Sequence, residues 1–462
     1  MNDKTLNDWV RRQAGHYPLI QALLGRRSRR FGPGMEIPSG PFKYRSAYAP
    51  QPLSEEEEAA LVFSAAGLNG YALADLSYGR GEGGNMLAGM AGRVVASADS
   101  IDNVSLFVIN DGGAYFIRRP QNLTPDERDH VISLAQAHEW GQIYRQLRVK
   151  ITDERIDLPV EPGVNFNINK WALYAPGSTY FLPVNDLTTI YINALLEAFE
   201  PEMGLFVVDE RNEFQPAGIR RFGRNRGGHL WNDPTDGRVV TVQGLEMSFA
   251  EATAVEMGGM LHSLALMAQA LGLGGYCNYA RNEYHWFEAL GFDMQPMSST
   301  EYAGVPPILA FFVDLMGQEY NFPYATGLRH GDDALLVAYC RPNFPDMAAA
   351  VRAFVEYKFG PQGVWRQKTL GSHWAAPERY SQQIERPSVE AVEATIAYCS
   401  YIDERYGRFP AYAAPYRTVI GYQATHVDVE FYDQFFKPEA LTDAQRTRFN
   451  LWRSAAEKSR LD

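Results

Sequence analysis

Residues 26–30 read Arg-Arg-Ser-Arg-Arg and concentrate cationic and hydroxyl side chains in one short segment. If the segment is extended, alternate side chains point the same way, so Arg26, Ser28 and Arg30 share one face. Two guanidinium groups and a hydroxyl on one face suit a phosphate dianion, because arginine donates paired hydrogen bonds to oxyanions. The alternative interpretation is a solvated basic patch that follows a helix.

A second segment is a long apolar stretch that ends in glycines. Residues 257–275 read MGGMLHSLALMAQALGLGG. The apolar part predicts a buried helix, and Gly272 suits the left-handed position just beyond its end. Gly274 and Gly275 would let the backbone approach a flat ring without side-chain obstruction. The alternative is a buried helix with an ordinary glycine stop.

A third segment places small polar residues directly before a predicted strand. Residues 92–100 read GRVVASADS and lead into residues 104–109, which read VSLFVI and are typical of a strand. Ser97 and Ser100 would lie in the loop at the start of this strand. On its own, the pattern also fits an ordinary turn.

In this order, the three segments resemble nitroreductase-like flavoproteins, and the resemblance covers residues 5 to about 317. In that family the basic segment after the first helix contacts the phosphate and ribityl chain of flavin mononucleotide (FMN). The small polar loop touches the isoalloxazine and ribityl groups, and the core helix ends in Leu-Gly-Leu-Gly. The resemblance therefore implies these cofactor-binding residues: Arg26, Ser28, Arg30, Ser97, Ser100, Gly272, Gly274 and Gly275.

The sequence departs from the family pattern at several positions. Phe31 follows Arg30 directly, whereas the family's phenylalanine usually lies two positions after the last basic residue. Ala96 stands where proline is common, and in this loop the chain is more similar to the thiazole/oxazole-dehydrogenase branch. The C-terminal lysine or arginine that often completes the family's phosphate site has no assigned position in this sequence.

The resemblance implies an α+β fold with a central antiparallel sheet wrapped by helices, in a homodimer that holds FMN in the subunit interface. It predicts an FMN-dependent oxidoreductase. Hydride would pass from a reduced donor such as NAD(P)H to a planar organic acceptor through flavin N5, because the cofactor carries the chemistry and the protein positions it. Such sites often need no side-chain nucleophile, so no catalytic residue is predicted. No metal site is predicted either.

Two further functions stay open. The first is an FMN-dependent dehydrogenase that oxidises a peptide or azoline-type intermediate, since the length beyond the resemblance favours a specialised substrate over a small promiscuous acceptor. The second is a scaffold that keeps the flavin fold without turnover, because the phosphate site is not complete. The expected partners are therefore a small-molecule or peptide-derived substrate and a second copy of the chain.

Local signals place secondary structure around these segments. Three capping boxes predict helix starts: Ser54 with Glu57, Thr124 with Glu127, and Ser248 with Glu251. Runs of β-branched and aromatic residues predict strands at residues 104–109, 114–117, 205–208, 308–313 and 335–339, with a hairpin turn at 111–113.

Bulk properties limit the classes of function. The 43 basic and 55 acidic residues give a net charge of −12, which disfavours generic binding to nucleic acid or an anionic membrane. Apolar residues make up 46% of the chain, enough for a large core. The three cysteines form no metal or disulfide pattern, and no signal-peptide or membrane-spanning run is evident, so we expect a cytoplasmic protein.

Glycine and proline clusters indicate how the chain is divided. We expect residues 1–320 to form a nitroreductase-like FMN-binding domain with insertions near 120–165 and 200–245. Residues 321–462 would form a mostly helical C-terminal extension of unknown role. Residues 79–84 match G-x-G-x-x-G, but no β-branched strand precedes them, so a mobile glycine loop is favoured over a dinucleotide site.

Overall fold

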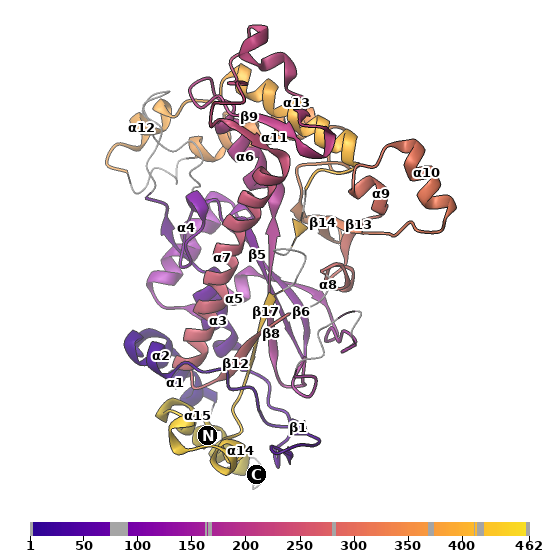
Figure 1. Cartoon of the computed structure of the whole chain (residues 1–462). Coiled ribbons are helices and arrows are strands. Elements are labelled where there is room, and N and C mark those ends of the chain that lie inside the picture. The colour runs from indigo at the N-terminus through magenta and orange to yellow at the C-terminus, as the bar shows by residue number, and fades with distance from the viewer. Residues whose placement is uncertain are drawn as a thin grey trace.

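A tall antiparallel sheet runs through the middle of the chain, and helices lie along it and above it (Figure 1). The computed structural model describes residues 3–73, 91–161, 164, 169–279, 283–367, 374–410, 412–413 and 420–458. The glycine-rich residues 79–84 lie outside the described residues.

Within the described part of the chain, the main sheet has ten strands, and all of its pairings are antiparallel. They are β5 (Val104–Asn110), β6 (Gly113–Ile117), β7 (Arg148–Thr152), β8 (Thr179–Asp186), β12 (Gly274–Tyr279), β13 (Phe292–Gln295), β14 (Tyr324–His330), β15 (Asp333–Val337), β16 (Tyr412–Ala413) and β17 (Ile420–Thr425). Smaller sheets pair β1 (Glu36–Ile37) with β2 (Tyr44–Arg45), β3 (Leu68–Tyr71) with β4 (Ala91–Arg93), and β9 (Phe206–Asp209) with β10 (Gln215–Pro216) and β11 (Val239–Thr241).

Helices account for much of the remaining described chain. They are α1 (Asp3–His16), α2 (Leu19–Gly25), α3 (Glu55–Ala66), α4 (Pro125–Gln136), α5 (Trp140–Leu147), α6 (Leu187–Ala198), α7 (Val242–Ala270), α8 (Tyr284–Ala289), α9 (Ser299–Tyr302), α10 (Pro307–Leu315), α11 (Met347–Phe359), α12 (Pro377–Gln383), α13 (Val389–Tyr406), α14 (Val429–Phe435) and α15 (Asp443–Lys458). The predicted α+β class with a central antiparallel sheet is therefore confirmed.

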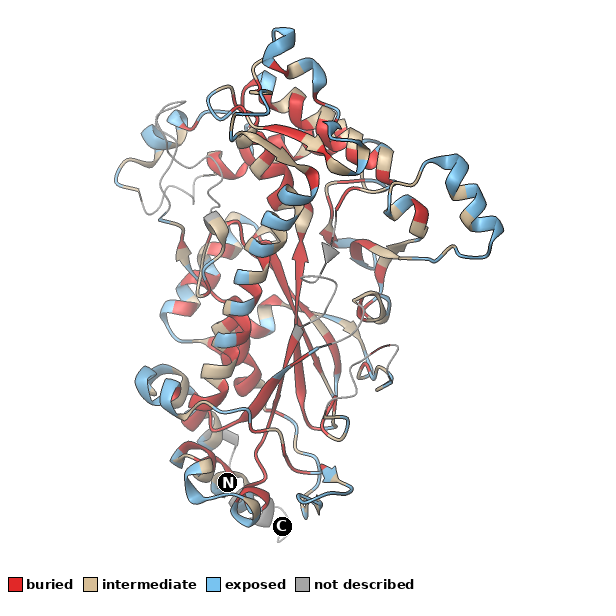
Figure 2. Ribbon diagram, in the orientation of Figure 1, coloured by how far each residue is buried: buried red, intermediate tan, exposed pale blue. Residues whose placement is uncertain are grey.

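The centre of the sheet is buried on both faces. Every residue of β8 is buried, and so are the first six residues of its neighbour β5 (Figure 2). Helix α7 packs against β5, β8, β12 and β17, and α3 packs against α7. Both strands are therefore nearly continuous apolar runs rather than alternating ones, as expected for strands covered on two sides.

Helix α7 is the longest element and ends where the glycine signal predicts. Gly272 has φ +67°, its N–H donates to Gln269 O, and Leu273 N–H donates to Ala268 O. This pair of bonds is a Schellman motif, which needs a left-handed residue at this position. The predicted start is wrong, because Thr241 caps the helix and Ser248 donates back to Gly244 O within the first turns.

Other local predictions have mixed outcomes. The capping boxes at Ser54 and Thr124 are confirmed, as is the hairpin between β5 and β6. Residues 308–313 are wrong as a strand, since they lie in α10. Prolines before and at the first position of α10 fit a helix start, and that signal outweighs the β propensity of its aromatic and branched residues.

The chain after residue 320 is helical in α11–α15 but also supplies β14, β15, β16 and β17 to the main sheet. The strands β16 and β17 pair with β8 and β12 from earlier in the sequence, and the predicted division into two domains stays a prediction. None of the described helices combines the length and the apolar character required to cross a bilayer.

A buried ionic contact fastens the C-terminal helix to the core. Arg448 of α15 donates to Glu57 of α3 at 2.7 Å, and His426 lies 3.7 Å from the same carboxylate. Burial alone would raise the pKa of Glu57, but Arg448, His426 and the hydrogen bond from the Ser54 backbone together outweigh burial, and the pKa falls to about 2. Burial, together with Arg448, lowers the pKa of His426 to about 4.

We predict that His426 makes the folded protein less stable in acid. Its folded-state pKa lies below the ordinary value of 6.5, so the unfolded chain binds a proton more readily between pH 6.5 and pH 4. Stability should fall by about 3 kcal/mol as pH drops through this window. Urea unfolding at several pH values should show this slope in the wild type and a shallower slope in His426→Asn. The exposed His130→Asn is the control, and an unchanged slope in His426→Asn would contradict the assignment.

Candidate cofactor-binding site

The basic segment turns at its centre and buries one arginine. Arg29 N–H donates to Arg27 O at 3.0 Å, so the chain bends around Ser28 instead of running straight. Arg29 is only 3% exposed, and its guanidinium donates to Ala440 O (2.8 Å), Gln269 Oε1 (2.8 Å) and Gly25 O (3.1 Å). Arg29 is therefore a structural residue whose donors are engaged within the protein.

The basic segment lies against the glycines that follow α7. Gly275 N–H donates to Arg29 O at 2.8 Å, and a Cβ on Gly274 would come within 2.6 Å of the same oxygen. A Cβ on Gly275 would lie 2.3 Å from Tyr422 Oη. Two of the three sequence segments are thus brought together. The close approach that these glycines permit is to protein atoms, and their contact with a cofactor stays a prediction.

An open cavity of about 430 Å³ lies beside the basic segment. Such a volume is in the usual range for small-molecule sites. Arg27, Ser28 and Arg30 lie along its border. Most of the other lining side chains are aromatic: Phe31, Phe42, Trp171, Phe431, Tyr432 and Phe436.

The three predicted residues of the basic segment have different surroundings. Ser28 is exposed at the cavity, and Arg30 is half-buried there, with its guanidinium 5.0 Å from the centre of the Tyr276 ring. Arg26 does not line the cavity. Burial raises the pKa of the Cys277 thiol, and the positive charge of Arg26 offsets part of that rise.

The cavity favours anions. No acidic side chain is among its described lining residues, and Arg27 and Arg30 bring positive charge to it. The whole chain carries a net charge of −12, so the local charge at this cavity is opposite in sign to that of the chain as a whole. Aromatic walls with a cationic border suit a planar ligand that carries a negative group.

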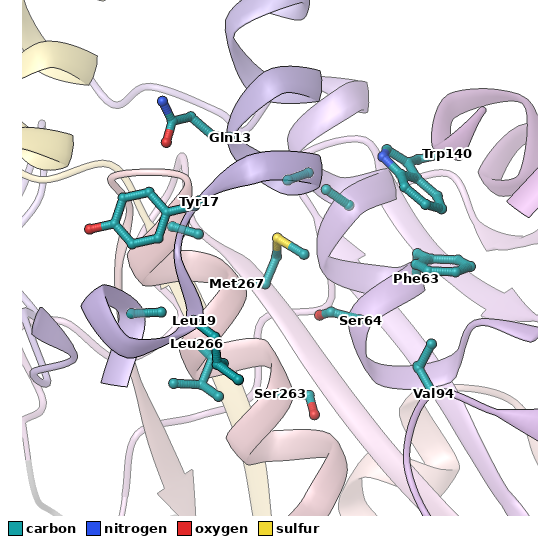
Figure 3. A pocket seen from close by; sticks show the side chains of 14 residues that line it. Gln13, Tyr17, Leu19, Phe63, Ser64, Val94, Trp140, Ser263, Leu266 and Met267 are labelled. Carbon is teal, nitrogen blue, oxygen red and sulfur yellow. The ribbon is translucent and has the colours of Figure 1, made fainter. Parts of the chain in front are cut away.

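A second cavity, of about 350 Å³, lies between α1, α2, α3 and α7 (Figure 3). Its lining is mostly apolar and includes Leu19, Phe63, Trp140, Leu266 and Met267. It has no basic or acidic side chain among its described lining residues, so it does not share the chemistry of the first cavity.

The predicted serine loop lies elsewhere along α7. Ser97 Oγ donates to Glu256 Oε2 at 2.8 Å and accepts from Asp102 N at 3.0 Å. Between positions 256 and 272, α7 rises by roughly 24 Å at its usual 1.5 Å per residue. The structure therefore does not bring Ser97 and Ser100 to the cavity that Ser28 and Arg30 line, and their role in cofactor binding stays a prediction.

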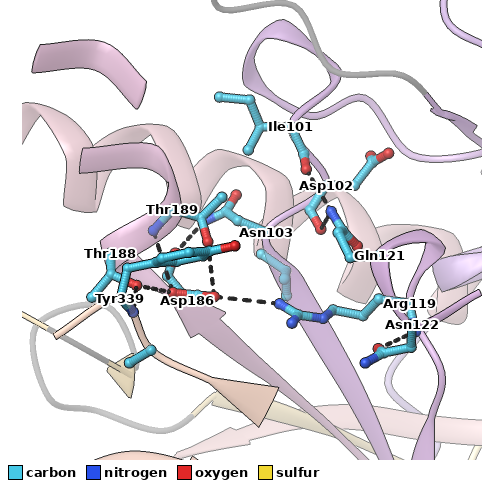
Figure 4. A network of polar contacts seen from close by, with 12 residues as sticks. Ile101, Asp102, Asn103, Arg119, Gln121, Asn122, Asp186, Thr188, Thr189 and Tyr339 are labelled. Atoms are coloured by element: carbon cyan, nitrogen blue, oxygen red, sulfur yellow. Dashed lines mark hydrogen bonds and ion pairs between the residues drawn. The ribbon is translucent and has the colours of Figure 1, made fainter. Parts of the chain in front are cut away.

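A buried polar network surrounds this loop (Figure 4). Arg119 forms an ion pair with Asp186 at 3.6 Å, and both side chains are buried. Asp186 also caps α6 through Thr189, and Asn103 Nδ2 donates to Asp186 O at 3.2 Å. This network has no signal in the sequence, because no spacing pattern links residues that meet only after β5 and β8 pair.

Two carboxyl groups near the serine loop are held away from water. Burial raises the pKa of Asp102 well above its ordinary value, and burial also raises the pKa of Glu256. Arg93, 3.4 Å from Glu256, opposes both shifts. Ser100 and Asp102 have φ of 53° and 55°, which strains this loop at two positions.

Comparisons with known proteins are sparse. A scan against protein-family models gives no match, and a search of curated proteins gives none either. Among solved structures, the chain is similar to the crystal structure of a candidate nitroreductase from Ralstonia eutropha JMP134, with 14% sequence identity. The alignment covers 59% of this chain and 75% of that chain, with a TM-score of 0.27. A likeness at this level establishes neither a family nor a function.

We predict that Arg29→Ala destabilises the fold by about 3 kcal/mol, because it leaves buried acceptors without their charged donor. The neighbouring Arg27→Ala is the matched control, since Arg27 is exposed and its guanidinium bonds only to nearby backbone oxygens, so its effect should stay within about 0.5 kcal/mol. Urea midpoints of the two variants give the comparison, and equal midpoints would contradict the structural role of Arg29.

We also predict that Asp102→Asn stabilises the protein at neutral pH. A carboxyl whose pKa is raised by folding contributes stability at low pH and loses it as pH rises above the ordinary value of 3.8. Asparagine keeps the shape, tolerates positive φ and does not ionise. The variant's gain in melting temperature should be larger at pH 7.5 than at pH 4. The exposed Asp157→Asn should show no such trend, and a pH-independent effect of Asp102→Asn would argue against this interpretation.

Proposed function

We propose that the chain is an FMN-dependent oxidoreductase that binds the cofactor in the cavity beside residues 27–31. The observation that carries the proposal is the pairing of a cationic and hydroxyl border with aromatic walls in one cavity of about 430 Å³. FMN is a planar ring system joined to a phosphate dianion, so it requires both kinds of surface. When bound, FMN would supply two-electron hydride chemistry at its N5 atom.

The residues of the cavity fit the two ends of FMN separately. Ser28 and the guanidinium groups of Arg27 and Arg30 are donors suited to the phosphate. Phe42, Trp171 and other aromatic side chains suit the isoalloxazine ring and would exclude water from it. The buried Arg29 does not bind ligand in this proposal. It holds the segment in place, so that its neighbours keep their positions at the border.

The direction of hydride transfer is the second part of the proposal. We propose that NAD(P)H reduces the flavin and that a planar organic acceptor reoxidises it. Oxidation of a peptide or azoline-type substrate is the alternative outcome, and a scaffold that never turns over is the third. The open mouth and aromatic walls of the cavity favour a planar substrate next to the cofactor.

We predict that the purified protein is yellow, or becomes yellow with added FMN, and that Arg30→Ala and Ser28→Ala weaken FMN binding. Loss of a hydrogen bond to a charged group removes about 1.5–3 kcal/mol, which is roughly a tenfold to hundredfold rise in Kd. The control is Arg226→Ala, an exposed arginine that does not line this cavity. Flavin fluorescence titration measures all three variants. A colourless protein that takes up no FMN would overturn the proposal and favour the scaffold.

Anaerobic mixing of the FMN-loaded protein with NADH or NADPH distinguishes the reductase from the dehydrogenase. Bleaching of bound FMN by NADH or NADPH within seconds would support the reductase. A flavin that binds but resists both donors would favour a dehydrogenase that is reduced by its own substrate. Arg226→Ala should bleach at the wild-type rate, which controls for general effects of arginine removal.

A further inference from the structure

We propose that the second cavity, between α1, α2, α3 and α7, is a binding site for a small neutral molecule with two rings and one hydrogen-bond acceptor, such as a ketone oxygen. This inference does not rest on the proposed cofactor or on the first cavity. It rests on a void of about 350 Å³ and on one buried hydrogen-bond donor in its wall.

The void exists because the helices around it carry small side chains. Helix α1 contributes Ala14, α2 contributes Ala22, α3 contributes Ala60 and α7 contributes Ala270. Protein interiors contain few voids larger than a water molecule, because larger side chains normally fill such space. Alanine at four facing positions therefore keeps open a volume that ordinary core packing would close.

The walls of this cavity are held by packing between helices. Helix α3 packs against α1, α5 and α7, and α2 packs against α7. Ala22, Ala60 and Ala270 are buried, so the inner surface of the cavity belongs to the protein core. A cavity whose walls are already in place binds a ligand with little entropy cost for ordering its surroundings.

Trp140 of α5 supplies the polar feature of the cavity. It is only 9% exposed, and its Nε1–H has no hydrogen-bond acceptor within the part of the chain that the structure describes. Figure 3 shows the indole nitrogen on the edge of the ring that faces the other lining side chains. Because a buried donor without an acceptor is destabilising, an acceptor atom that enters the cavity gains the bond that Trp140 lacks.

Neighbouring rings fix the orientation of Trp140. The centre of the Phe63 ring lies 4.2 Å from that of Trp140, and His138 stacks with Trp140 at 5.2 Å, with 17° between the ring planes. Rotation of the indole would disturb both contacts. The Nε1–H donor is therefore preorganised toward the cavity before any ligand arrives.

The lining selects a neutral ligand. The described lining residues include no acidic or basic side chain, so a carboxylate or an ammonium group would lose its hydration without gaining a charged partner. Ser64 is already engaged, since its hydroxyl donates to Leu61 O at 2.8 Å. The indole N–H of Trp140 can only donate, so the matching group on the ligand is an acceptor such as a carbonyl oxygen.

The volume of the cavity sets the size of the ligand. An engineered apolar cavity of about 150 Å³ holds one benzene ring. A void of about 350 Å³ therefore accommodates two rings with a short link between them. A protein surface laid across the mouth would not reach a tryptophan that is 9% exposed, whereas a small molecule inside the cavity would.

Benzophenone and diphenylmethane are matched probes, because both have two rings and they differ in one carbonyl group. We predict that the full chain binds benzophenone with a micromolar Kd in equilibrium dialysis and binds diphenylmethane roughly tenfold more weakly. Trp140→Phe should bring the two Kd values within about twofold of each other, because the donor is gone while the aromatic wall remains. A wild type that binds neither probe, or a difference that survives in Trp140→Phe, would overturn the proposal.

Filling the void is the second test. Ser263→Leu places a larger side chain in the lining and should weaken binding of both probes at least tenfold. Ser248→Leu is the matched control, since Ser248 is exposed on the same helix and does not line the cavity. Trp171→Phe, in the first cavity, should leave both Kd values unchanged. Loss of binding in Trp171→Phe with full binding in Ser263→Leu would place the probes in the first cavity and contradict the assignment.

The position of the bound probe can be mapped directly. Irradiated benzophenone forms covalent bonds with nearby C–H groups, so peptide mass spectrometry locates it on the full chain. We expect the label on α7 at Leu266 or Met267, which line the cavity. A label confined to residues 27–42 or 431–436, around the first cavity, would overturn the proposal.

Discussion

The hydrogen bonds of the buried Arg29 guanidinium are the contacts on which the end of the molecule with the aromatic cavity depends. It joins the end of α2 through Gly25, the end of α7 through Gln269 and the C-terminal chain through Ala440. Its backbone carbonyl holds Gly275 at the start of β12. A charge removed from water must have its donors bonded, so these four parts of the chain can meet in only one arrangement. The aromatic cavity is a consequence, since its walls come from both ends of the sequence.

This anchor also explains why adjacent arginines have different roles. Arg29 turns inward at a bend, so Ser28 and Arg30 are left at the border of the cavity on either side of a fixed point. A basic segment without such an anchor would be a solvated patch, which was the alternative interpretation of the sequence. The rigidity that a ligand site needs is therefore supplied by Arg29, whose guanidinium is already hydrogen-bonded within the protein.

Features that depend on residues close together in the sequence were predicted well, and contacts between distant residues were not. The capping boxes of α3 and α4, the hairpin after β5 and the glycine end of α7 depend on residues within a few positions, and each was predicted. The aromatic walls contributed by Phe431 and Phe436 lie about 400 positions from Ser28, and no spacing rule connects them. The start of α7 was missed because Thr241 caps the helix without a glutamate three positions later, so the sequence lacks the full capping-box pattern there.

The failure at α10 has a different physical basis. Its aromatic and branched residues suit a strand, its prolines suit a helix start, and its apolar character suits a buried position. The structure follows the helix start that the prolines favour. It leaves the apolar residues exposed rather than buried. Natural sequences rarely keep such a conflict unless something outside the single chain resolves it.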